Sequence, residues 1–100
     1  EFQKAQNNPH RKIQSTIYIG RCFAKRNMND LAARKFQEAL KDKIEFDEEK
    51  KDLIYQLGCV LEAMGKKTEA MDQFKQLYEV DIGYRDVAAK VDAYYAAGGQ

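Results

Sequence analysis

The chain of 100 residues has little of what turn-rich or disulfide-linked folds need: one proline, six glycines, two cysteines and no tryptophan. So few turn-forming residues disfavour a β-sandwich and favour long helices with short connections. Its apolar runs extend over only a few residues, so we expect no secretory signal, no membrane-spanning segment and no membrane partner. The hydrophobic fraction of 44% is nevertheless too high for a disordered chain. The length allows one small domain.

Residues that carry chemistry are also scarce. The single histidine is His10, and the two cysteines, Cys22 and Cys59, are 37 positions apart. This set does not supply the four ligands of a zinc site, so we expect no metal, and we expect inert thiols in a reducing compartment such as the cytoplasm. The sequence also lacks a Gly-rich phosphate-binding loop and a Ser-His-Asp set. We therefore expect a noncatalytic protein that uses no cofactor.

The 17 basic and 16 acidic residues give a net charge of only +1, which provides no reason to expect a polyanionic partner. The two signs are unevenly distributed, because residues 1–44 carry +6 and residues 45–100 carry −5. The basic half leaves nucleic-acid binding as an alternative. Tyr18 and Phe23 lie near these cations, but Phe23 belongs to the apolar pattern and is expected to be buried. The basic residues also point in mixed directions around their helices, so no nucleic-acid partner is predicted.

Five helices are predicted by apolar residues that recur at spacings of three and four, and capping residues mark their ends. Asn8 and Pro9 begin the first helix, because Asn accepts from free N–H groups and Pro fits the first helical position. Asn27 can adopt the left-handed backbone that ends this helix. Asn29 or Asp30 can cap the second helix.

The later helices show similar signals. Asp47 is expected to cap the third helix and Gly65 to end it. The fourth and fifth helices are expected over Thr68–Val80 and Asp86–Ala96. No segment alternates with a period of two for long enough to form a strand, so the predicted fold class is all-α.

The first two helices and the next two carry the same pattern. A glycine is followed after 12 residues by an alanine and after 16 by a phenylalanine, and the pattern occurs twice with an offset of 38. These residues are Gly20, Ala32 and Phe36 in the first copy and Gly58, Ala70 and Phe74 in the second. A repeat of this kind indicates stacked helical hairpins in which each glycine lets the second helix approach closely.

The pattern resembles the tetratricopeptide repeat (TPR) family, which reads W-x2-L-G-x2-Y and then A-x3-F over about 34 residues. The copies begin at Thr16 and Ile54 instead of tryptophan, and both lack the family's terminal proline. The chain is identified as a bacterial-type TPR fragment, with the resemblance covering roughly residues 10–82. It implies an α-solenoid of antiparallel helix hairpins with a C-terminal capping helix.

The resemblance also implies a division into parts. Residues 1–8 are expected to be the tail of a preceding repeat, its second helix only, and residues 98–100 a disordered tail. Residues 9–44 and 45–82 are expected to form the two hairpins, and residues 83–97 the capping helix, in which Asp92 takes the place of the glycine.

In such a solenoid the first helices line a concave groove, where partners of this family usually bind. The expected groove residues lie one turn apart and off the motif positions. They are Gln14, Ile17, Arg21 and Ala24 in the first copy, Asp52, Tyr55, Cys59 and Glu62 in the second, and Asp86, Ala89 and Ala93 in the capping helix.

The family's clamp of Lys, Asn and Arg for chaperone tails has no counterpart here. Ile17 and Tyr55 occupy the lysine positions, and Arg21 and Cys59 occupy the asparagine positions, so chaperone-tail capture is not expected. The resemblance instead implies a protein-interaction scaffold that binds an unidentified protein or peptide in the groove. Self-association through exposed ends of the solenoid is the alternative.

Overall fold

The computed structural model of the chain describes residues 9–43 and 45–98. These residues form five helices and no strand, which confirms the predicted all-α class. The helices are α2 (Pro9–Lys25), α3 (Asn29–Asp42), α4 (Glu48–Ala63), α5 (Lys67–Val80) and α6 (Val87–Ala96). The tail predicted over residues 1–8, including the cap at Asn8, and most of the tail predicted over 98–100 lie outside the described residues.

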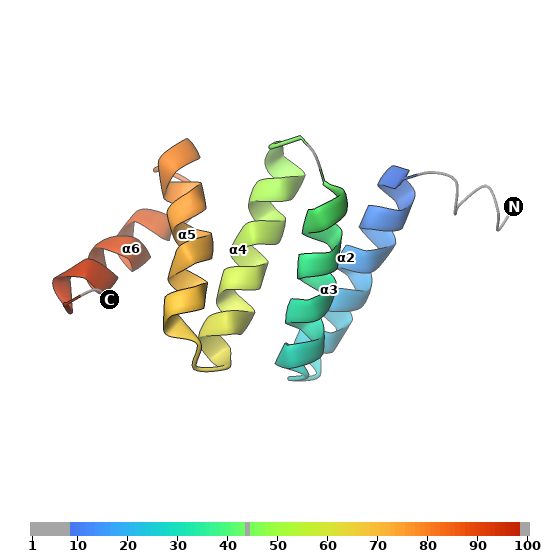
Figure 1. Cartoon of the computed structure of the whole chain (residues 1–100), viewed down its shortest axis with the longest axis horizontal. Coiled ribbons are helices and arrows are strands. Elements are labelled where there is room, and N and C mark those ends of the chain that lie inside the picture. Colours follow the sequence, from blue (N-terminus) through green and yellow to red (C-terminus); the bar gives the residue numbers. More distant parts are fainter. Residues whose placement is uncertain (1–8, 44, 99–100) are drawn as a thin grey trace, which may run out of the picture.

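Each helix packs mainly against its neighbours in the chain, so the helices follow one another across the molecule from α2 to α6 (Figure 1). The molecule is elongated, with extents of 52 × 28 × 18 Å. Its buried apolar residues form one cluster that runs from Ile13 on α2 to Tyr94 on α6. The core is therefore a strip along the junctions between successive helices.

A close contact between a glycine and a phenylalanine joins α2 to α3, and a second one joins α4 to α5. A Cβ atom added at Gly20 would lie 2.7 Å from Phe36 Cε1, and one added at Gly58 would lie 2.7 Å from Phe74 Cε1. Both rings are fully buried. Because carbon atoms do not approach so closely, each ring occupies space that only a glycine leaves open. The predicted close approach of the two helices is confirmed at both positions.

The turns inside the two hairpins are also equivalent. Asn27 has a φ of 63° and Gly65 a φ of 82°, so both adopt the left-handed conformation predicted for them. In each turn the next amide N–H donates to a carbonyl five residues earlier, at 2.9 Å. This bond is typical of a helix that ends in a Schellman motif.

The helix starts are less regular than the sequence suggests. Asp47 caps α4 as predicted, because its Oδ1 accepts a hydrogen bond from the Lys50 amide at 3.0 Å. The prediction that Asn29 or Asp30 caps α3 is wrong, because the residue before this helix is Met28 and no side chain caps it. The tight turn after α2 leads directly into α3 and leaves no extended residue that could serve as a cap.

A buried lysine holds the connection between α3 and α4. The Nζ atom of Lys43 lies 2.8 Å from Asp47 Oδ2 and 2.8 Å from Glu49 Oε1, and its side chain is only 7% exposed. Hydrogen bonds to Asp47 and then Glu49 raise the pKa of Lys43, and the bond from Lys43 lowers the pKa of Asp47. The ion pair therefore persists over a wide range of pH around neutrality.

The last helix repeats the buried face of α4. Three residues of α6 are buried, each 34 positions after a buried residue of α4. They are Val87, Val91 and Tyr94, which follow Leu53, Leu57 and Val60. Asp92, which lies 34 positions after Gly58, is exposed. A side chain at that position prevents the close contact that Gly58 allows with a following helix.

Candidate binding groove

The predicted groove residues lie on α2, α4 and the start of α6. A hollow of about 280 Å³ between α2 and α4 is lined by Gln14, Ile17, Tyr18, Arg21, Glu49 and Asp52. The structure thus brings four predicted residues together at one place and adds Tyr18 and Glu49. Ile17 also belongs to the core, so it provides an apolar base beneath polar neighbours.

Asp52 is the centre of a polar network that crosses from α2 to the segment before α6. Its Oδ2 atom lies 2.8 Å from Arg21 Nη2, and its Oδ1 atom lies 2.8 Å from Arg85 Nη2. Gln56 donates to Asp52 Oδ2 at 2.6 Å and accepts from Arg21 Nε at 3.3 Å. One carboxylate therefore connects three consecutive parts of the groove surface.

An aromatic cluster continues the network toward α6. Tyr55 donates a hydrogen bond from its hydroxyl to Asp86 Oδ1 at 2.6 Å. The guanidinium carbon of Arg85 lies 4.9 Å from the ring centre of Tyr55 and 5.4 Å from that of Tyr84. Burial, and then the bond to Asp86, raises the pKa of Tyr55, while the same bond lowers the pKa of Asp86. At neutral pH this pair therefore stays a neutral phenol bound to a carboxylate.

The far end of α4 carries the remaining predicted residues. Lys90 on α6 donates to Glu62 Oε1 at 3.1 Å. Cys59 is half-buried, and burial raises the pKa of its thiol, so the thiol stays protonated at neutral pH. Cys22 is also a free thiol. Of the three predicted alanines, Ala24 is half-buried, whereas Ala89 and Ala93 are exposed on α6.

The charged residues that were expected to line the groove have partners within the chain. Arg21 pairs with Asp52, Asp52 also pairs with Arg85, and Glu62 pairs with Lys90. The residues that complete these pairs and were missed are Gln56, Arg85 and Lys90, and Tyr84, which packs beside Tyr55 and Arg85, was missed as well. Gln56 lies one helical turn after Asp52, a spacing that could have revealed it. Tyr84 and Arg85 belong to the connection before α6, which the repeat pattern does not include.

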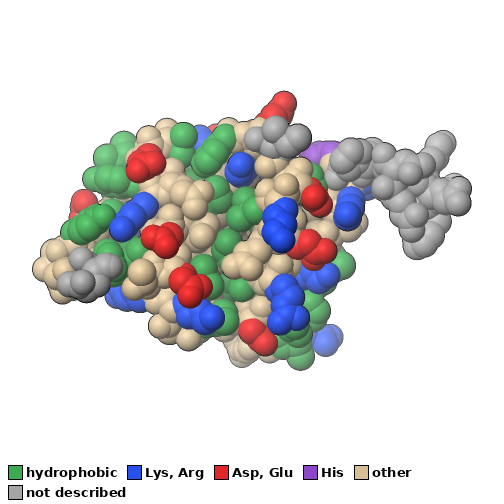
Figure 2. All heavy atoms as spheres, in the orientation of Figure 1, with side chains coloured by type: hydrophobic (Ala, Val, Ile, Leu, Met, Phe, Trp, Pro, Cys, Tyr) green, Lys and Arg blue, Asp and Glu red, His purple; other side chains and the backbone are tan. Residues whose placement is uncertain are grey.

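The described part of the chain contains no arrangement typical of a metal site or of a membrane span. Within residues 9–43 and 45–98, no three His, Cys, Asp and Glu side chains cluster as metal ligands would. No helix within the same ranges has the length and apolar character needed to cross a bilayer. Basic and acidic side chains are interspersed on the face turned to the reader in Figure 2.

Comparison of the chain with protein-family models, curated proteins and solved structures gave no match.

Proposed function

We propose that the chain is part of a TPR-type α-solenoid and serves as a noncatalytic scaffold that binds a protein segment in the groove of α2, α4 and α6. The repeated contacts of Gly20 with Phe36 and of Gly58 with Phe74 support the repeat. The buried face shared by α4 and α6 supports it further, because equivalent helices then recur at intervals of 38 and 34 residues.

The observation that carries the binding proposal is the hollow between α2 and α4. Ile17 forms the apolar base of the hollow, and Tyr18, which is 68% exposed, lies at the edge of the hollow. Arg21 and Asp52 add charges of both signs. Tyrosine and arginine are enriched where protein interfaces gain most of their affinity. The hollow is large enough for one apolar side chain of a partner.

The charged pairs around the hollow can exchange partners at low cost. The side chains of Arg21 and Arg85 are 52% and 51% exposed, and both pair with Asp52. Exposed ion pairs of this kind contribute only about 0–1 kcal/mol. A carboxylate of the partner can therefore replace Asp52 at one arginine, and a basic group of the partner can approach Asp52. We propose a segment with one apolar anchor flanked by charges of both signs.

Nucleic-acid binding has less support than protein binding. Arg21 and Lys43 in the basic half pair with carboxylates of the same chain. Phe23, the aromatic residue expected to be buried, is half-buried and packs against the core. The two free cysteines suit a reducing, cytoplasmic setting, which we include in the proposal.

Peptide selection tests the proposed groove. Peptides selected on the chain from a random library are measured against wild type, Arg21→Ala and the exposed control Gln76→Ala on α5. We expect Arg21→Ala to weaken binding about tenfold, equivalent to about 1.4 kcal/mol, and Gln76→Ala to leave it unchanged. Selection of no peptide, or equal binding by wild type and Arg21→Ala, would contradict the proposal.

A further inference from the structure

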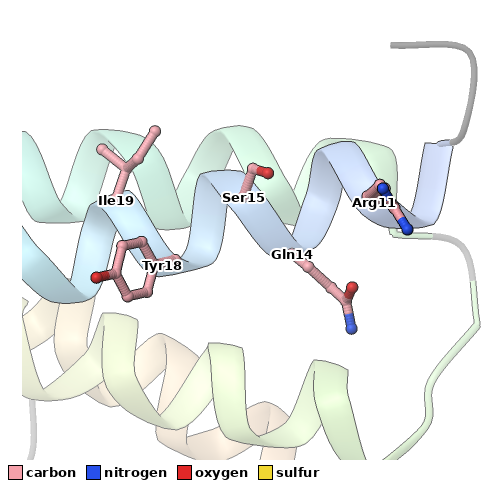
Figure 3. A pocket seen from close by; sticks show the side chains of 5 residues that line it. All are labelled: Arg11, Gln14, Ser15, Tyr18 and Ile19. Atoms are coloured by element: carbon pink, nitrogen blue, oxygen red, sulfur yellow. The ribbon is translucent and has the colours of Figure 1, made fainter. Parts of the chain in front are cut away.

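The side of α2 that points away from α3 is a second surface, which shares Gln14 and Tyr18 with the edge of the groove. We call it the α2 outer face. It borders a hollow of about 400 Å³ lined by Arg11, Gln14, Ser15, Tyr18 and Ile19. Figure 3 shows these five side chains projecting from one side of the helix, with Ser15 and Ile19 along one edge and Gln14 and Tyr18 along the other. Ile19 is 41% exposed and lies beside Tyr18, which is 68% exposed.

The same positions are covered on the other first helices. Ser15 and Ile19 on α2 have counterparts 38 residues later on α4 and a further 34 residues later on α6. The counterparts are Leu53 and Leu57 on α4, and Val87 and Val91 on α6, and all four are buried. A preceding helix packs against each of these two helices, α3 against α4 and α5 against α6. The α2 outer face therefore has the geometry of a surface that accepts a helix.

The composition of the α2 outer face differs from that of the covered faces. Its middle is apolar, with Ile19 and the half-buried Cys22, but its ends are polar. Ser15 stands where α4 has a leucine, and Arg26 stands where α4 has Met64. An apolar centre with a polar rim is typical of protein–protein interfaces.

Charge indicates what kind of helix fits. The α2 segment contains no Asp or Glu. Arg11 lines the hollow, and helical spacing places Lys25 and Arg26 on the same side, seven positions after Tyr18 and Ile19, whereas Lys12 and Arg21 pair with Asp42 and Asp52. Two copies of this face would repel each other, whereas an acidic helix would be attracted. We propose that the α2 outer face binds an acidic amphipathic helix of a protein partner, whose apolar side packs on Tyr18 and Ile19.

A designed helix tests this proposal. The probe is a peptide of about 16 residues with Leu along one face and Glu on both flanks, and its twin carries Lys in place of Glu. Binding to the chain is measured by calorimetry at low and high salt. We expect the Glu peptide to bind at least about tenfold more tightly than the Lys peptide, and high salt to weaken its binding.

Two variants locate the binding surface. Ile19→Asp puts a carboxylate at the centre of the face, and its exposure allows the fold to persist, which circular dichroism checks. We expect Ile19→Asp to weaken the binding of the Glu peptide at least about tenfold. The control Tyr55→Phe removes the groove hydroxyl that bonds to Asp86 and changes nothing on the α2 outer face. It should leave the affinity for the Glu peptide unchanged, so this test can fail without the groove proposal failing.

Several results would overturn the acidic-helix proposal. Equal binding of the Glu and Lys peptides would show that charge does not select the partner. Equal binding of the Glu peptide by wild type and Ile19→Asp would show that the peptide does not bind at this face. Binding of phosphatidylserine vesicles in place of the peptide would assign the face to a membrane surface. A dimer in light scattering that Ile19→Asp dissociates would assign it to a second copy of the chain.

Discussion

The α2–α3 and α4–α5 hairpins are built alike inside but differ in what surrounds them. Gly20 and Gly58 make the same close contact with a buried phenylalanine. Outside that contact, Leu57 on α4 is 1% exposed, whereas its counterpart Ile19 on α2 is 41% exposed. The difference indicates that packing within a hairpin is encoded locally, while burial of the outer face depends on a neighbouring helix.

The largest expected effect comes from removing the phenylalanine rings. Phe36→Ala and Phe74→Ala should each lower the free energy of unfolding by about 3–5 kcal/mol, because each ring is fully buried. We expect Phe74→Ala to lower the free energy of unfolding more than Phe36→Ala does. The ring centre of Phe74 also lies 5.7 Å from that of Tyr55 and 5.2 Å from Lys90 Nζ, so its removal loses further contacts. Urea denaturation of both variants measures the difference. A larger loss for Phe36→Ala would contradict the asymmetry between the hairpins.

The next effect comes from filling the space beside each ring. Gly58→Ala should destabilise the chain by about 1–3 kcal/mol, because overpacking outweighs the helix propensity gained from alanine. Gly20→Ala should lower the stability less, because among the described helices α2 packs mainly on α3 and can shift away from Phe36 more easily than α4 can shift from Phe74. Thermal denaturation ranks the two variants.

Gly83 provides the matched control for these substitutions. An added Cβ there would meet only Asp81 Oδ1, at 3.9 Å, so Gly83→Ala should leave stability nearly unchanged. If Gly58→Ala proved as mild as Gly83→Ala, the close contact would not be a constraint on the fold.

The connections after the two hairpins place opposite charges against α4. Lys43 ends the first hairpin and Asp81 the second, and each forms an ion pair with α4. The pKa of Asp47 is lowered by Lys43, so its stabilisation is present above about pH 4 and is lost as the pH falls through the lowered pKa. The pKa of Lys43 is raised, so its stabilisation is lost only in strong alkali, above its ordinary pKa.

Lys43→Met tests this connection. The variant should be less stable than wild type by about 1–2 kcal/mol at pH 7, because Asp47 and Glu49 lose a charged hydrogen-bond partner. The difference in stability between the variant and wild type should narrow at pH 3, as the pH falls toward the lowered pKa of Asp47 and protonation removes its charge. Urea midpoints at the two pH values measure this difference, and a difference that widened in acid would count against the ion pair.

The smallest expected effect concerns the turns within the hairpins. Asn27→Gly should stabilise the chain by a few tenths of a kcal/mol, because glycine adopts a left-handed conformation without strain. Gly65→Ala should destabilise it by about 1 kcal/mol for the converse reason. Calorimetric melting temperatures measure both changes. A destabilising Asn27→Gly would show that the Asn27 side chain has a further role in its turn.

Much of the fold could be predicted because its signals are local. The left-handed turns at Asn27 and Gly65 and the cap at Asp47 follow from single residues and their neighbours. The burial of Lys43 could not be predicted, because it depends on carboxylates that only the completed α3–α4 connection brings within hydrogen-bond distance. The exposure of Ile19 could not be predicted either, because the motif gives its position on the helix but not what lies opposite.

The candidate groove was predictable to a similar extent. Helical spacing placed Arg21 and Asp52 on the same side of adjacent first helices, and the structure brings them into contact. Arg85 was missed because it lies outside the helices, at a left-handed φ of 45° that no periodic pattern indicates. Its position over Tyr55 therefore emerged only from the three-dimensional arrangement.

Amide hydrogen exchange compares the two hairpins most directly. We expect the middle of α4, covered by α3 and α5, to exchange more slowly than the middle of α2, which among the described helices packs mainly on α3. Addition of the acidic helical peptide should then slow exchange in α2 and leave α4 unchanged. Equal protection of α2 and α4 in the free chain would contradict the claim that two equivalent first helices differ in what covers them.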